Sequence, residues 1–163
     1  MHKYRLLELA EQIATTAHKG QVDKAGIEYI NHPKTVASFC QTVDAKIVGW
    51  LHDVVEDTNV TFDDLELIGF DDYLIEALKC VTKENNYNEE EYYFRIKNNE
   101  IAREVKLADL THNSDFSRIP SSAPEELKTK MKGKQKKYLI YKAYLLDSLP
   151  NEKLYEYIKR MEE

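Results

Sequence analysis

The 163-residue sequence has few of the residues that build turn-rich or cross-linked folds. Five Gly and four Pro are too few for a β sandwich with many tight turns. The two cysteines, Cys40 and Cys80, are far apart and form no CxxC motif, which is typical of small apolar thiols in a reducing compartment. No apolar run marks a secretory signal or a membrane span, so we expect a cytoplasmic protein with no membrane partner.

The sequence also has fewer basic than acidic residues. The chain has 23 Lys and Arg against 29 Asp and Glu, for a net charge of −6. This balance argues against a nucleic-acid partner, which would need a broad basic face. With 42% hydrophobic and 32% charged residues, the chain can form a core and a charged surface. Its length predicts a single domain over residues 1–163.

The apolar residues recur at helical spacing, and no strand pattern competes with them. The spacing therefore predicts an all-α domain. Thr61 and Asp64 resemble a capping box, Gly69 would end that helix, and Asp44 would cap the helix before it. The helices are expected at residues 3–19, from Pro33, from Asp44 through Leu51, at 61–69, 72–83, about 91–113, 125–147 and 150–161, with Pro150 in the first turn of the last.

The segment from Trp50 to Thr58 is the most informative part of the sequence. On a continuous helix of ~100° per residue, one imidazole and three carboxylates share a face, and the opposite face is apolar. Such a face could simply be solvated. Alternatively, because carboxylates crowded together repel one another, it could surround a cation such as Mn, Fe, Zn or Ni. The polar face consists of His52, Asp53, Glu56 and Asp57.

Two more residues could complete a metal site. His32 precedes Pro33 at the start of a predicted helix, where it is either a ligand or a histidine packed in the core. Asp109 lies in a mostly apolar helical stretch, and burial of its carboxylate would need a cation or a metal. Lys106 is one turn before Asp109, so an ion pair without function is the other interpretation.

Seven short segments together resemble the opening and the HD signature of RelA/SpoT hydrolase domains. The resemblance extends over about residues 4–118, and the segments follow one another in the family's order. It is closest to the small stand-alone alarmone hydrolases, which have no synthetase domain. The segments are AHKGQ (17–21), KAG (24–26), YINHP (29–33), LHDVVEDT (51–58), VTK (81–83), VKLAD (105–109) and HN (112–113).

The resemblance implies an HD-domain helical bundle and a metal-dependent enzyme. The implied reaction is release of pyrophosphate from the 3′ position of (p)ppGpp, to give GDP or GTP. By matching positions, the implied residues are the metal ligands His32, His52, Asp53 and Asp109, the catalytic Glu56 and Asp57, and the substrate-binding Lys24 and Asn113. The implied cofactor is one divalent ion, most often Mn²⁺, with Glu56 or Asp57 taking a proton from water beside it.

Two positions depart from the family pattern. Asp23 stands where the family usually has arginine, and Leu110 stands where it has Arg or Lys. These changes keep open a same-fold phosphohydrolase for another nucleotide, such as NADPH 2′-phosphate or a nucleoside monophosphate, and a non-catalytic nucleotide sensor. Six lysines in residues 128–137 form either a solvated face or a basic rim near an anion. The sequence also leaves a homo-oligomer open, and residues 123–163 are expected to add C-terminal helices.

Overall fold

The computed structural model describes residues 2–163, and these residues form helices joined by loops. The expected all-α class is confirmed, with an isolated β-bridge between Val22 and Glu28. Within residues 2–163, no helix combines the length and apolar character needed to cross a membrane. The helices are α1 (Lys3–Ala17), α2 (Asn31–Phe39), α3 (Val43–Leu51), α4 (Val54–Asp57), α5 (Phe62–Ile68), α6 (Asp72–Val81), α7 (Glu89–Lys97), α8 (Glu100–Asn113), the 3-10 helix η1 (Phe116–Arg118), α9 (Glu125–Leu145) and α10 (Asn151–Glu162).

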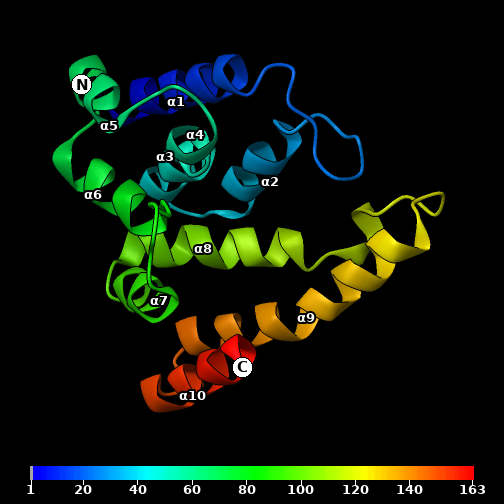
Figure 1. Cartoon of the computed structure of the whole chain (residues 1–163). Helices are drawn as coiled ribbons and strands as arrows, with labels where there is room; N and C mark the ends of the chain where they lie inside the picture. The colour runs from blue at the N-terminus through cyan, green and yellow to red at the C-terminus, as the bar shows by residue number, and fades with distance from the viewer. Residues whose placement is uncertain (1) are drawn as a thin grey trace.

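Helix α8 runs through the middle of the molecule, with α1–α6 on one side and α7, α9 and α10 on the other (Figure 1). It packs against α2, α3, α6, α7 and α9. Val105 and Leu110 of α8 are buried in the hydrophobic core. A polar side chain on α8 that faces α2 and α3 is therefore held by a helix fixed on several sides.

Gly49 lets α2 and α3 approach closely. A Cβ atom at Gly49 would lie 3.2 Å from the Cα of Ala37, closer than ordinary van der Waals contact. His32 is in the first turn of α2 and His52 directly follows α3. The close approach of the two helices brings these imidazole rings to 5.2 Å between centroids.

Helices α1, α6 and α9 begin at the expected residues 3, 72 and 125, whereas two expected details of other helix starts are wrong. The capping box of Thr61 and Asp64 is confirmed, with both reciprocal hydrogen bonds present. The prediction that Asp44 caps α3 is wrong, because the Thr42 hydroxyl accepts from the backbone N–H of Ala45 and Asp44 lies in the first turn. Pro150 is the N-cap of α10 and not part of its first turn.

Two expected continuous helices are interrupted. The helix expected over 91–113 is divided into α7 and α8, because the Asn99 side chain caps a new start by accepting from the N–H of Ala102. The helical reading through Trp50–Thr58 is also wrong at its centre, since His52 and Asp53 form a turn between α3 and α4. The turn still leaves Val54 buried and Glu56 exposed, as the predicted faces required.

Candidate active site

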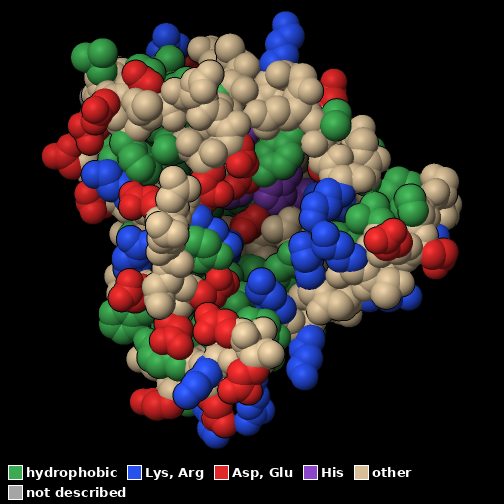
Figure 2. Space-filling model, viewed as in Figure 1, with side chains coloured by type: hydrophobic (Ala, Val, Ile, Leu, Met, Phe, Trp, Pro, Cys, Tyr) green, Lys and Arg blue, Asp and Glu red, His purple; other side chains and the backbone are tan. Residues whose placement is uncertain are grey.

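All eight residues selected from the sequence line a single cavity of about 480 Å³. Figure 2 shows histidine side chains at the bottom of this hollow, with acidic side chains on one side and Lys or Arg on the other. The cavity brings together residues from the loop before α2, the turn before α4, α4 itself and α8. The eight residues are Lys24, His32, His52, Asp53, Glu56, Asp57, Asp109 and Asn113.

Two buried histidines and a buried aspartate form the innermost cluster. His32, His52 and Asp109 each present one ligand atom, and these atoms lie within 4.8 Å of one another. His32 Nε2 is 2.8 Å from Asp109 Oδ1, and His52 Nε2 is 3.6 Å from the same oxygen. Asp53 Oδ2 lies 2.9 Å from His52 Nε2 and 3.8 Å from His32 Nε2, so it completes a set of two nitrogens and two carboxylates.

The orientation of His52 fits a cation ligand. Its Nδ1 donates to the carbonyl oxygen of Gly49 at 2.7 Å, so Nε2 is the nitrogen that can offer a lone pair once a cation takes the place of its proton. Nε2 is buried and makes no hydrogen bond within residues 2–163. Its 2.9 Å contact with Asp53 has the length of an ion pair but not the direction of a hydrogen bond. A divalent metal ion is bound by such an imidazole nitrogen together with nearby carboxylate oxygens, here those of Asp53 and Asp109.

The electrostatics of the cluster also favour an added positive charge. Burial lowers the pKa of His52, but the carboxylates of Asp53 and Asp109 outweigh burial and raise that pKa well above its usual value. Burial raises the pKa of Asp53, but His52 opposes it and the net result is a lowered pKa of about 2. Burial also raises the pKa of Asp109, but Lys106 and the two histidines hold that pKa well below its usual value, so both carboxylates are ionised. The residues present fit a divalent metal ion on donor type and on charge.

Asp109 also forms the ion pair that the sequence offered as an alternative. Lys106 Nζ lies 3.0 Å from Asp109 Oδ2, while Asp109 Oδ1 faces His32. The ammonium group of Lys106 lies over the rings of Tyr92 and Tyr93, at 5.3 and 5.8 Å from their centroids. The ion pair and the histidine cluster use different oxygens of Asp109, so Asp109 can pair with Lys106 and contribute to the cluster at the same time.

Glu56 and Asp57 lie at the edge of the cluster, on α4. Ligand atoms of Asp53, Glu56 and Asp57 lie within 4.8 Å of one another. Glu56 Oε1 accepts a hydrogen bond from the backbone N–H of Lys83, and Oε2 takes no part in this hydrogen bond. Partial burial, with smaller effects from neighbouring carboxylates, raises the pKa of both Glu56 and Asp57. A carboxylate with a raised pKa is a stronger base than an ordinary surface glutamate.

The lining of the cavity also supplies positive charge, from several parts of the chain. Arg118 of η1 and Lys134 of α9 reach the cavity, so part of the lysine run is a basic rim. Lys19 and Arg103 do not line it. The cations that line the cavity are Lys24, Lys83, Lys106, Arg118 and Lys134.

Leu110 and Asp23, the two departures from the family pattern, lie in different surroundings in the structure. Leu110 is buried in the core, so this position does not face the cavity. Asp23 Oδ1 accepts from the N–H groups of Ala25 and Ile27 and so stabilises its own loop. Its Oδ2 lies 3.7 Å from Arg118. Asp23 and Arg118 therefore form an ion pair in the lining of the cavity.

Sequence reasoning assigned no role to two residues beside the cluster. The Tyr29 hydroxyl donates to Asp53 Oδ2 at 2.5 Å, and burial raises the pKa of Tyr29, which keeps it a donor. His112 lies 2.7 Å from His32 through their Nδ1 atoms. Burial and the charge of Arg118 lower the pKa of His112 to about 4. The signal available for His112 was its position three residues after Asp109, on the same face of α8.

We expect Mn²⁺, used as a probe, to stabilise this fold through the cluster. At 100 times its dissociation constant, a ligand of the folded state adds about 2.7 kcal/mol, which is roughly 5–10 °C in Tm for a chain of this size. Thermal unfolding with and without Mn²⁺ measures the shift. His52→Gln should lose the shift, and the same change at the exposed His2 should keep it. An equal shift in His52→Gln would place the ion elsewhere.

Comparisons with known proteins give relatives named as guanosine-3′,5′-bis(diphosphate) 3′-pyrophosphohydrolases and as GTP pyrophosphokinases. No family model matches the chain. It is 30% identical over 140 residues, 76% of its length, to a guanosine-3′,5′-bis(diphosphate) 3′-pyrophosphohydrolase of Borreliella burgdorferi. It is 36% identical over 121 residues, 66% of its length, to the protein of the same name in Spiroplasma citri. The chain spans only 20% and 16% of the lengths of these two relatives.

A solved structure shares the fold. It is described as a metazoan orthologue of SpoT that hydrolyses ppGpp and plays a role in starvation responses. The TM-score is 0.63 with 23% sequence identity, and the match covers 88% of this chain and 84% of that one. This likeness supports the helical fold independently of the sequence matches.

Proposed function

Since this chain is a homologue of RelA/SpoT-type proteins over about three quarters of its length, we propose that it hydrolyses (p)ppGpp and releases pyrophosphate from the 3′ position. The products would be GDP from the tetraphosphate and GTP from the pentaphosphate. The observation that carries the proposal is the cavity itself, where an acidic, histidine-containing wall faces a wall of cations. A phosphorylated nucleotide presents the negative charge that the basic wall would bind.

The proposed metal ligands are His32, His52, Asp53 and Asp109, and the proposed ion is Mn²⁺. Imidazole nitrogen and carboxylate oxygen together suit this class of divalent ion. A divalent ion bound there supplies Lewis-acid stabilisation of phosphate oxygens and makes water more acidic. Because Lys106 holds Asp109 Oδ2, the other oxygen of that carboxylate is kept directed at the two histidines.

Glu56 is the proposed general base, with Asp57 beside it. The backbone N–H of Lys83 fixes Glu56 through Oε1, so Oε2 can accept the proton of the attacking water. Oxygen from water bonds to the phosphorus next to the ribose 3′ oxygen. The bond from that phosphorus to the ribose oxygen breaks, and the ribose oxygen takes up a proton as pyrophosphate leaves.

Lys24 and Asn113 are the proposed substrate-binding residues, together with the other cations of the basic wall. Lys83, Arg118 and Lys134 come from three different elements and border the same cavity. Charge on three sides of a phosphate chain would hold it in one orientation against the acidic wall.

A panel of nucleotides with Mn²⁺ tests this proposal, with pyrophosphate and orthophosphate measured separately. We expect pyrophosphate from ppGpp and pppGpp, and none after metal removal with a chelator. Orthophosphate released only from other nucleotides would instead indicate a phosphohydrolase of different specificity. Tight nucleotide binding without turnover would indicate a sensor.

A further inference from the structure

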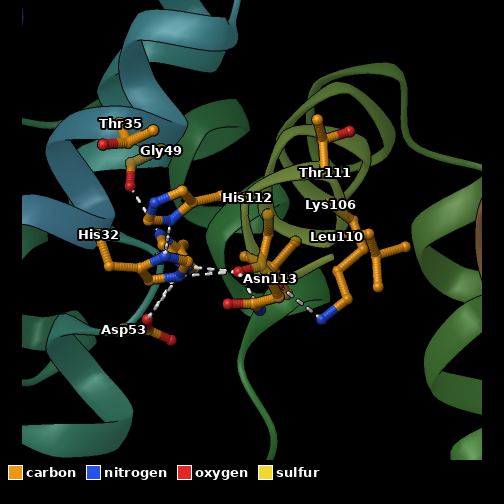
Figure 3. Close-up of polar contacts among 12 residues, drawn as sticks. His32, Thr35, Gly49, Asp53, Lys106, Leu110, Thr111, His112 and Asn113 are labelled. Carbon is orange, nitrogen blue, oxygen red and sulfur yellow. Dashed lines mark hydrogen bonds and ion pairs between the residues drawn. The ribbon is translucent and has the colours of Figure 1, made fainter. Parts of the chain in front are cut away.

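His112 makes an unusual contact with a proposed metal ligand. Its Nδ1 atom lies 2.7 Å from the Nδ1 atom of His32, and the two rings are stacked with centroids 5.0 Å apart and planes 16° apart (Figure 3). Two imidazole nitrogens at this distance form a hydrogen bond only if one carries a proton and the other offers a lone pair. The contact therefore fixes the proton positions of both rings relative to each other.

The other nitrogen of His32 decides which ring is the donor. His32 Nε2 lies 2.8 Å from Asp109 Oδ1, and because an ionised carboxylate only accepts, Nε2 donates this hydrogen bond when no cation is bound. To bind a cation there, Nε2 must present a lone pair, so the ring must carry its proton on Nδ1. His32 Nδ1 then donates and His112 Nδ1 accepts. His52 shows the parallel arrangement, with its Nδ1 donating to the Gly49 carbonyl oxygen at 2.7 Å.

We propose that His112 is a positioning residue that holds His32 in its metal-binding tautomer and orientation; this rests on the metal site in the proposed function. Both proposed histidine ligands then have an acceptor behind them, a backbone carbonyl for His52 and a side chain for His32. Helix α8 supplies both Asp109 and, three residues later, His112. One helix thus presents one ligand to the ion and orients a second ligand on α2.

The test compares two side chains of nearly the same shape at position 112. Asparagine can place its Oδ1 where the imidazole Nδ1 lies and still accept from His32, whereas leucine cannot accept. We expect His112→Leu to weaken Mn²⁺ binding by about 10–100-fold, the usual effect of losing an outer acceptor of a metal-bound histidine. We expect His112→Asn to stay within about threefold of the unmutated protein.

Calorimetric titration of metal-free full-length protein with Mn²⁺ alone, without nucleotide, measures these affinities. His112→Phe keeps an aromatic ring but has no acceptor, so it should weaken binding as leucine does. Unfolding temperatures of the metal-free variants show whether each one folds. If either His112→Leu or His112→Phe fails to fold, the Mn²⁺ affinity of the other is compared with that of His112→Asn. Equal affinities in all variants, equal weakening in asparagine and leucine, or no Mn²⁺ binding by the unmutated protein would each overturn the proposal.

The experiment separates this inference from the proposed function. If the unmutated protein binds Mn²⁺ but releases no pyrophosphate from ppGpp, the proposed function fails while the asparagine and leucine comparison still decides the role of His112. If ppGpp is hydrolysed and the two variants bind Mn²⁺ equally, only the role of His112 fails.

Discussion

Glu56→Gln is expected to reduce kcat by about 10²–10⁴, the usual contribution of a general base, while Mn²⁺ affinity stays within a few-fold. Glutamine keeps the shape of the side chain, and its Oε1 can still accept from the N–H of Lys83. What it loses is the capacity to take a proton from water. Steady-state hydrolysis of ppGpp and Mn²⁺ titration of the same preparation measure the two quantities.

Glu104→Gln is the matched control for this change. Glu104 also accepts backbone hydrogen bonds, from the N–H groups of Gln41 and Thr42, but it does not line the cavity. Hydrolysis in Glu104→Gln should stay close to that of the unmutated protein. Near-normal kcat in Glu56→Gln would contradict its assignment as the base and would move attention to Asp57.

Asp109→Leu is expected to abolish metal binding and to destabilise the fold by about 3–5 kcal/mol, because it leaves the buried charge of Lys106 without its partner. In a chain of this length the loss corresponds to a fall in Tm of roughly 10 °C or more. Thermal unfolding without metal isolates this effect from the loss of the ligand.

The double variant Lys106→Met, Asp109→Leu separates stability from function. With both charges replaced by apolar groups of similar size, most of the lost stability should return, since buried ion pairs are often replaceable in this way. Mn²⁺ binding and hydrolysis should remain absent. A double variant as unstable as Asp109→Leu would show that the cost comes from packing or from the lost hydrogen bonds of His32 and Asn113 to Asp109, and not from the unpaired lysine.

The sequence predicted the fold class and the composition of the cavity better than it predicted helix boundaries. His32 lies in the first turn of α2 and His52 directly follows α3. Both helices pack on α8, which carries Asp109, so these motif residues meet in the cavity. The break at Asn98 and Asn99 did have a signal in the sequence, because the four consecutive polar residues 97–100 interrupt the apolar spacing and Asn99 is a favourable N-cap. The turn at His52 and Asp53 was missed because a helical projection assumes continuity. The projection was right that Val54 is buried and Glu56 exposed, but His52, which it assigned to the polar face, is buried.

The contacts that orient the site were out of reach of the sequence. The partnership between His32 and His112 joins residues 80 positions apart and depends on how α2 lies against α8. The contact between Glu56 and the backbone of Lys83 has no side-chain signature at position 83. Leu110 appeared to remove a phosphate-binding cation, but its burial could be recognised only once α8 was placed in the core.

Hydrolysis of ppGpp in ¹⁸O-labelled water with Mn²⁺, followed by mass spectrometry of every product, tests whether water attacks the phosphorus next to the ribose 3′ oxygen. We expect unlabelled GDP and pyrophosphate carrying one ¹⁸O atom, in equal amounts, and neither product when a chelator removes the metal. Orthophosphate as the released product, label in the nucleoside, or unchanged hydrolysis in the presence of the chelator would contradict this mechanism.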